Sequence, residues 1–240
     1  MCAVAFFYNF STNLLETANA SGMSAAASYL DREKSFFATG FKSMDLICTS
    51  IATCIIIISP ISLLPDKFGI AAFAAVPLTV SLCSSLVEFW FSITNFPATG
   101  SDNMWPFHWY NAVNKYPYEE AIAGTAIQSF MKVAKYAFFD IVKELVAMKI
   151  DPSIRPLFKG VFDGSITKLG KSIGSFYGII MFAITGAQDS RYYFGVTTLV
   201  IVFFCSIWVL PIRYLSKSYS EAKKSGTYMD PGLSNPDIKL

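Results

Sequence analysis

Charged side chains inside otherwise apolar stretches are the residues of this chain that could do chemistry. Glu16 is the only charged side chain between Met1 and Leu30. A charged group at the centre of a bilayer costs about 2.5–3.5 kcal/mol on insertion scales, so its presence there needs a reason. Glu16 is either a neutralised or interfacial carboxyl, or a pathway carboxylate that pairs with a cation or carries a proton. Glu88 and Asp45 lie nearer the ends of their stretches, and we expect them at the interface.

A second group of charges lies between residues 132 and 144. The lysines of this group are three, eight and eleven positions apart, which places them on one side of a regular helix at 100° per residue. One interpretation is a helix that leaves the membrane after Met131 and exposes its charges to water. The other is a basic stripe that faces a wet cavity and accepts an anion. The charged residues are Lys132, Lys135, Asp140, Lys143 and Glu144.

Lys171 lies among glycines that recur every four residues. Gly170, Gly174 and Gly178 predict a face on which a neighbouring helix can approach closely. The Gly-Lys-Ser sequence is not a P-loop, because five residues separate Gly164 from Gly170 and the motif needs four. Lys171 is either a flexible point charge that reaches a ligand phosphate or an interfacial lysine that extends to the headgroups.

The composition argues against an enzyme and against a resident cofactor. The chain of 240 residues has 53% hydrophobic and 15% charged residues, whereas soluble domains carry about 25% charged residues. His108 is the only histidine, so a site with several histidines within this chain is excluded. The five cysteines are scattered and form no CxxC pair, so neither a zinc site nor a redox motif is indicated. No nucleophile–base pair appears.

Long uncharged stretches determine how these residues are positioned. A helix that crosses a hydrocarbon core needs about 20 apolar residues, and its backbone must be satisfied internally. The sequence therefore predicts an all-α membrane protein with six transmembrane helices, over about residues 4–29, 40–64, 68–95, 118–148, 160–188 and 192–215. Four of these contain runs without Asp, Glu, Lys or Arg, namely 46–64, 68–87, 172–188 and 192–212.

The basic residues of the loops predict the orientation. With six spans, one side holds Lys67, Lys149, Arg155, Lys159, Lys168, Arg213, Lys217, Lys223, Lys224 and Lys239, and the other holds Arg32, Lys34, Lys42, Lys115 and Arg191. This bias places both termini in the cytoplasm. A five-span alternative, with a peripheral first segment, would move the N-terminus outside. We expect one transmembrane domain over residues 1–218 and a polar cytoplasmic tail, partly disordered, over 219–240.

Three segments resemble a known family. The run KYAFFDIVKE at residues 135–144 resembles the KYSLFDPTKE signature of the plastid and parasite nucleotide transporters, the ATP/ADP translocases of chloroplasts and obligate intracellular bacteria. The segment with Lys159, Gly160 and Asp163, followed by LGKS at 169–172 and by Gly174, resembles a second family stretch. The run YNFSTNLLE at residues 8–16 is similar to the segment that opens the family's seventh helix.

The resemblance covers about residues 6–218 and carries expectations about fold. The family has twelve helices in two halves, and this chain resembles only the second half. The family fold is similar to that of the major facilitator transporters, which implies three-plus-three inverted repeats within these six helices. The implied partners are a lipid bilayer and either an N-terminal six-helix half or a second copy of the chain.

The resemblance also implies roles for individual residues. The family's key carboxylate of the seventh helix corresponds to Glu16, and its key lysine of the eleventh helix to Lys171. The signature helix supplies the remaining candidates, which are Lys135, Asp140, Lys143 and Glu144. The chain departs from the family pattern in three places: Ile141 replaces the signature proline, Ile173 displaces a glycine, and no lysine follows within a few residues of Glu16.

These expectations converge on transport of nucleotides such as ATP and ADP, by exchange or uptake. Lys135, Lys143 and Lys171 would offset the dehydration cost of the phosphates, and Glu16 would compete for one of these lysines when no nucleotide is bound. The resemblance suggests the inner membrane of an intracellular bacterium, with no nucleic acid as a partner. The alternative is a non-transporting membrane protein, or a truncated family member that acts as a partner subunit.

Overall fold

The computed structural model describes residues 1–30, 33–59, 65, 68–96, 105–106 and 115–229. Across these ranges the backbone is mostly helical, and no strand forms apart from one isolated bridge between Ile150 and Met229. The predicted all-α class is confirmed. The C-terminal part of the predicted helix at 40–64 and the last eleven residues of the predicted tail lie outside the described ranges.

Long helices form where the sequence has its uncharged stretches. Those that run without interruption are α1 (Cys2–Tyr29), α2 (Lys34–Ile58), α4 (Ile70–Asn95) and α9 (Phe194–Ser225). A short 3-10 turn, η4 (Ser190–Tyr193), leads into α9. The helices predicted at 4–29 and 68–95 are reproduced within two residues at each end.

Two further rods consist of helical pieces joined by π-helical turns. One is formed by α5 (Pro117–Ala134), η2 (Lys135–Phe139) and α6 (Asp140–Met148), and the other by α7 (Arg155–Gly160), η3 (Val161–Ile166) and α8 (Thr167–Thr185). A π-turn closes its hydrogen bonds over five residues instead of four. Side chains that follow such a turn are therefore rotated away from the face that regular helical spacing predicts.

Some helix ends differ from the prediction. The rod that was predicted from residue 160 begins at Arg155, because Pro156 lies in the first turn, where proline is tolerated. The last helix was predicted to end near residue 215 but continues to Ser225, through the predicted domain boundary at 218–219. It stops at Gly226, whose φ of 68° lies in the left-handed region that favours glycine. The polar residues after 215 therefore extend the helix instead of unravelling it.

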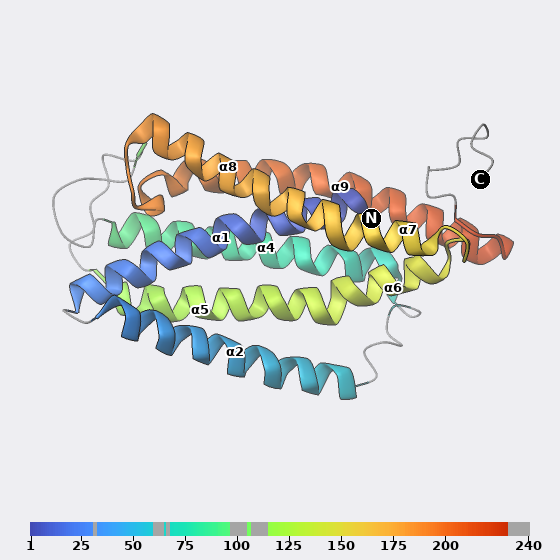
Figure 1. Ribbon diagram of the computed structural model, residues 1–240, viewed down its shortest axis with the longest axis horizontal. Coiled ribbons are helices and arrows are strands. Elements are labelled where there is room, and N and C mark those ends of the chain that lie inside the picture. The colour runs from blue at the N-terminus through green and yellow to red at the C-terminus, as the bar shows by residue number, and fades with distance from the viewer. Residues whose placement is uncertain (31–32, 60–64, 66–67, 97–104, 107–114, 230–240) are drawn as a thin grey trace.

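The helix α1 is at the centre of the bundle. It contacts α2, α4, α5, α8 and α9, and Figure 1 shows it in blue between the α8–α9 side and the α5–α2 side. Its buried side chains Phe10 and Leu15 join a core that includes Trp208 of α9 and Phe162 of η3. The helix α2 lies at the edge of the bundle, against α5 and α1. Any polar residue of α1 that faces α2 or α5 is therefore placed between helices.

The glycines of α8 allow it to approach α1 closely. A Cβ atom on Gly170 would lie 2.7 Å from the backbone oxygen of Phe6, and one on Gly174 would lie 2.6 Å from Oδ1 of Asn13. The predicted packing face is confirmed at these two positions. Gly178 differs, because a Cβ there would meet nothing within 4 Å. The close helix contact therefore ends before Gly178.

Three helices of the described chain are long and apolar enough to cross a membrane, over Thr39–Ile56, Ile70–Asn95 and Ser190–Ser225. Only 11% of the first window is buried inside the protein. Its exposed side chains include Ile47, at 60% exposure, and Ile55, at 63%. Soluble monomers rarely expose large contiguous apolar patches, so this face of α2 is suited to lipid or to another apolar surface.

Candidate functional site

A cavity of about 380 Å³ lies between α1, α2 and α5. Its charged lining consists of two carboxylates and two ammonium groups, from Glu16, Asp45, Lys42 and Lys132. The remaining lining residues are Asn19, Met23, Phe41, Thr125 and Gln128. Among the residues predicted for the site, Glu16 alone lines this cavity. Its role as a pathway carboxylate stays a prediction.

Asp45 and Lys132 form an ion pair across the cavity, from α2 to α5. The other carboxylate oxygen of Asp45 accepts hydrogen bonds from the hydroxyls of Ser129, at 2.9 Å, and Thr49, at 3.2 Å. The Asp45 side chain is 9% exposed and that of Lys132 is 32% exposed. Asp45 is therefore covered by protein, and the ammonium group of Lys132 remains accessible from the cavity.

Glu16 and Lys42 have no ion-pair or hydrogen-bond partner among the residues that the structure describes. Glu16 is half-buried and Lys42 is exposed. The cavity thus contains four formal charges of which only two are paired directly. Two buried amides also border it, from Asn19 and Gln128, and each leaves one polar atom without a partner in the described chain.

The other predicted residues lie along η2, α6 and α8. Lys143 bridges Asp140, at 3.4 Å, and Asp163 of η3, at 3.1 Å. Glu144 pairs with Lys159 of α7 at 2.8 Å. These contacts join the end of one rod to the start of the next, so they tie two helices together. The structure brings Asp140 and Lys143 into one group, and neither of them lines the cavity around Glu16.

Lys135 and Lys171 are not members of either group. The ammonium group of Lys135 lies 5.2 Å from the ring centroid of Tyr136. Lys171 is exposed on α8 and has no ion-pair partner in the described part of the chain. Its neighbours Gly170 and Gly174 contact α1. The ammonium group is therefore free to meet another molecule.

The basic stripe, one of the two interpretations of residues 132–143, is divided by η2. Lys132 meets Asp45 on α2, whereas Lys143 meets Asp163 on η3. The prediction assumed 100° per residue throughout, but the π-turn between the two lysines changes the rotation. The two lysines accordingly face different helices.

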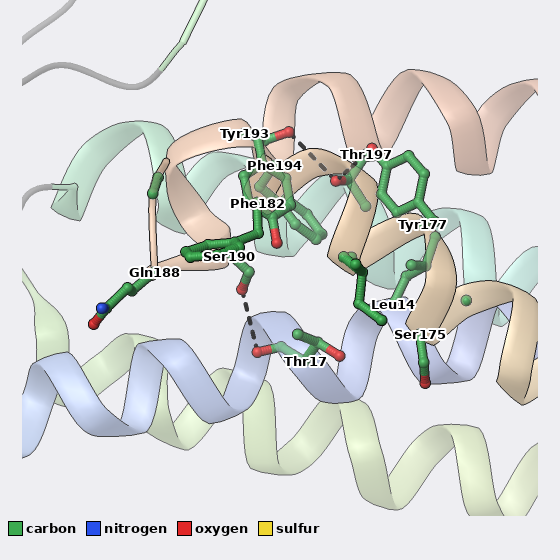
Figure 2. Close-up of a pocket in the computed structure, with 14 residues that line it drawn as sticks. Leu14, Thr17, Ser175, Tyr177, Phe182, Gln188, Ser190, Tyr193, Phe194 and Thr197 are labelled. Atoms are coloured by element: carbon green, nitrogen blue, oxygen red, sulfur yellow. Dashed lines mark hydrogen bonds between the residues drawn. The ribbon is translucent and has the colours of Figure 1, made fainter. Parts of the chain in front are cut away.

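A larger cavity, of about 460 Å³, lies between α1, α8, η4 and α9 (Figure 2). None of its lining residues is charged. Some of its polar groups are engaged with one another: the hydroxyls of Tyr177 and Thr197 lie 3.0 Å apart, and Ser190 donates to the backbone oxygen of Thr17 at 3.3 Å. Gly178 lines this cavity, which explains the open space beside it. A polyphosphate would find no cation here.

A buried network of charges closes the end of the bundle near η4. The guanidinium of Arg191 donates to both carboxylate oxygens of Glu120, at 3.2 and 3.1 Å, and to both of Asp189. Asn95 donates to Glu120 at 2.9 Å. Glu88 is 2% exposed and lies near Glu120 and Arg191.

Sequence reasoning missed this network, because it assigned Arg191 to a loop and Glu88 to an interface. The one available signal was the Asp-Ser-Arg sequence at 189–191, in which acid and base are two residues apart. Protein covers Glu88 and Asp45 alike. In the described ranges no group of three or more His, Cys, Asp or Glu side chains is placed to hold a metal ion.

Comparison with known proteins identifies the family. The TLC ATP/ADP transporter family matches residues 1–219. ADP,ATP carrier protein 1 of Encephalitozoon cuniculi is 31% identical, over 96% of this chain and 41% of its own length. ADP,ATP carrier protein 1 of Paranosema grylli is 26% identical, over 98% of this chain and 42% of its own length.

A bacterial relative matches a shorter region. ADP,ATP carrier protein 4 of Rickettsia conorii is 33% identical over 43% of this chain and 20% of its own length. No solved structure matches the chain. The chain spans about two-fifths of the length of the relatives that it matches from end to end. The family match covers more than nine-tenths of the sequence, and the chain therefore belongs to the TLC ATP/ADP transporter family.

Proposed function

We propose that this chain is the C-terminal half of a carrier that moves nucleotides such as ATP and ADP across a membrane, by exchange or uptake. The observation that carries the proposal is the cavity between α1, α2 and α5, where Glu16 lies with two lysines in a bundle whose outer helices are apolar. Charges in such a position mark substrate or ion pathways. The names of the relatives, ADP,ATP carrier proteins, supply the substrate class.

A carrier of this kind needs a second half. Carriers of this type place the substrate between two halves that rock against each other, and this chain spans about two-fifths of its relatives. The second half is an N-terminal six-helix unit, in the same polypeptide or in a separate one, or a second copy of this chain. Lys171 and Lys42 are exposed in the single chain, and in the assembled carrier they would face that second half. The three-plus-three inverted repeat belongs to the same proposal.

The predicted residues take the following roles in this proposal. Lys135, Lys143 and Lys171 contact the phosphates, since several cations are needed to replace the water that a polyphosphate loses. Glu16 is the pathway carboxylate. Asp140 and Glu144 hold the end of the signature helix, in keeping with the ion pairs of Asp140 with Lys143 and of Glu144 with Lys159. Because Lys143 is already paired, its phosphate contact requires that it leave Asp140 or Asp163.

The proposed setting is a cell membrane with both termini in the cytoplasm, according to the excess of basic residues on one side. The bacterial inner membrane is one candidate location. The relatives that match nearly the whole chain come from Encephalitozoon and Paranosema, and those from Rickettsia match less than half of it. Protease accessibility of tags at residues 1 and 240 in sealed vesicles tests the orientation.

The function is tested first by binding and then by transport. Membranes that contain the chain should bind labelled ATP saturably, and unlabelled ADP should displace it. The variant Lys171→Gln should abolish nucleotide uptake while the protein still inserts into the membrane. Lys168→Gln is the matched control, because Lys168 is an exposed lysine of the same helix one turn earlier. Normal uptake by Lys171→Gln would refute the role of this lysine.

A second candidate function is that of a non-transporting partner subunit. The separation of Lys143 and Lys171 from the Glu16 cavity favours it for the chain by itself. Under this alternative, membranes that contain the chain alone bind no ATP. The chain instead co-purifies with another membrane protein, whose transport changes when this chain is removed.

A further inference from the structure

We propose that Asp45 is an internal competitor for Lys132: its carboxylate occupies the ammonium group while the cavity is empty, and a phosphate of the nucleotide takes its place. This inference rests on the proposed function and deepens it, since it names a phosphate-binding lysine and the group that the phosphate displaces. Neither residue was among the six site residues predicted from the sequence. Both line the cavity that contains Glu16.

The bonding of Asp45 makes it a partner that can be exchanged. One carboxylate oxygen pairs with Lys132, and the other accepts from Ser129 and Thr49. When Lys132 turns to a phosphate, the two hydroxyls still satisfy the buried carboxylate. Without these donors, release would leave a buried charge unpaired, which is costly. The hydroxyls therefore allow Asp45 to lose its lysine without a large penalty.

The exposure of the two side chains also indicates that Lys132 can leave Asp45 for a phosphate. The Lys132 side chain is 32% exposed, so water and ligands can reach its ammonium group from the cavity. Lysine is a compact charge on a flexible stem, and it can turn from one oxygen ligand to another. Asp45 has no such freedom, because it is short and nearly covered. The mobile member of the pair is thus the cation, as capture of a phosphate requires.

The charge balance of the cavity explains why a competitor is useful. Glu16 and Asp45 offset Lys42 and Lys132, so the formal charge of the lining is zero. An empty cavity therefore carries no unbalanced charge in a low-dielectric bundle, where such a charge would be costly. A polyphosphate that enters the cavity needs to displace only one carboxylate, that of Asp45, to bind the ammonium group of Lys132. Occupation by the carboxylate thus stabilises the empty state and weakens nucleotide binding.

Glu16 has a different position in the same cavity. The sequence suggested that Glu16 would compete for a lysine, but in the structure the carboxylate that contacts a lysine of the cavity is that of Asp45. Among the described residues Glu16 has no ion-pair partner. The two carboxylates therefore have different roles. Asp45 pairs with the ammonium group of Lys132, and Glu16 stays available to the ligand or to a proton.

Binding of labelled ADP to the full chain in lipid nanodiscs tests the proposal, with inorganic pyrophosphate as a second probe. Asp45→Asn should tighten ADP binding roughly two- to fivefold, which is the scale of a partly exposed ion pair. Lys132→Gln should weaken it about tenfold or more, since it removes a charged hydrogen bond to phosphate. Glu119→Gln is the control that matches the charge change of Asp45→Asn. Glu119 is an exposed carboxylate of α5, the helix that carries Lys132. This control variant should leave binding unchanged.

The double variant decides whether Asp45 acts through Lys132. Asp45→Asn should have no effect in a chain that already carries Lys132→Gln. An equal tightening in both backgrounds would show a general field effect and overturn the proposal. Ser129→Ala provides a second route, because it removes a donor that holds the released carboxylate, and it should weaken ADP binding while the helical circular dichroism is retained.

The possible failures are distinguishable. If the wild-type chain binds ADP and Asp45→Asn binds it no more tightly, the competitor role is wrong and nucleotide transport stands. If the wild-type chain shows no saturable binding, either alone or with its second half, both proposals fall. Displacement of ADP by pyrophosphate in the wild-type chain but not in Lys132→Gln supports a phosphate contact. Equal displacement in both would contradict it.

Discussion

The helix α5 carries two ion pairs of opposite character, one near each end. At its start, Glu120 meets Arg191, and both side chains are 2% exposed. Twelve residues later Lys132 meets Asp45, and the lysine is 32% exposed. The guanidinium is held by two carboxylates in bidentate contacts, whereas the ammonium group has one carboxylate. One helix thus takes part in two kinds of contact. The buried contact of Arg191 with Glu120 and Asp189 is called the fixed joint, and the contact of Lys132 with Asp45 is called the exchangeable contact.

The difference follows from the chemistry of the two cations. Arginine presents a rigid fork that matches carboxylates in pairs, and its contacts add geometric specificity. In a buried position the loss of one partner leaves an uncompensated charge. A lysine that reaches water keeps a solvated alternative, so its pair is weak. We infer that the Arg191 network fixes how α4, α5 and η4 join, and that the Lys132 pair leaves α2 and α5 able to adjust.

The largest expected effect comes from breaking the fixed joint. Arg191→Gln should lower the free energy of unfolding by about 3–5 kcal/mol, because Glu120 would remain buried without its cation. Thermal unfolding in detergent measures the change. The loss of the monodisperse peak on gel filtration serves as the readout. Arg191→Lys is the control, since it keeps the positive charge but loses the planar guanidinium. Its free energy of unfolding should lie between those of the wild-type chain and Arg191→Gln. A loss below about 1 kcal/mol in Arg191→Gln would contradict the assignment of this network as structural.

An intermediate effect is expected where α8 approaches α1. Gly170→Ala should destabilise the protein by about 1–3 kcal/mol, the usual range for overpacking, because its Cβ would lie 2.7 Å from the backbone oxygen of Phe6. Gly178→Ala is the matched control on the same helix, with nothing within 4 Å. It should be neutral or stabilise by up to about 1 kcal/mol through helix propensity. Equal melting temperatures for the two variants would show that the close contact does not form.

A small effect on stability is expected at the exchangeable contact. Lys132→Gln should change the free energy of unfolding by no more than about 1 kcal/mol, although it weakens nucleotide binding. The same unfolding assay applies, with Asp45→Asn in parallel. If Lys132→Gln were as destabilising as Arg191→Gln, the contrast between the two ends of α5 would disappear.

The smallest effect is expected at the rim of the bundle. Glu144→Gln should change stability by less than about 0.5 kcal/mol, because Glu144 and Lys159 are 53% and 40% exposed and solvent screens such pairs. Raising the salt concentration should change the melting temperature of the wild-type chain and the variant alike. A salt-dependent difference between them would show that this pair contributes more to stability than its exposure indicates.

The helices could be predicted from the sequence because their signal is local. Uncharged runs of sufficient length located α4 and α9, and the four-residue glycine spacing predicted a closely packed face of α8, which is confirmed at Gly170 and Gly174. Glu16 was singled out because it is a lone charge in an apolar helix, and it does line a charged cavity. Each of these inferences needed only residues within one helix.

The pairings between helices could not be predicted in the same way. Asp45 and Lys132 are 87 residues apart, and their contact depends on how α2 lies against α5. Arg191 and Glu120 are 71 residues apart, so Arg191 was counted among the loop cations. The π-turn η2 also has no periodic signal in the sequence, and it separates Lys132 from Lys143. The register of one helix against another and the rotation of each helix about its axis depend on how the whole bundle packs, so the pattern within one helix does not predict them.

The turn at η4 also bears on the order in which contacts form during folding. Asp189 and Arg191 are two residues apart and contact each other within the turn. A contact between near neighbours closes a short loop and costs less chain entropy than the contact of Arg191 with Glu120, which joins residues 71 positions apart. We expect the turn to hold the guanidinium in position before Glu120 reaches it.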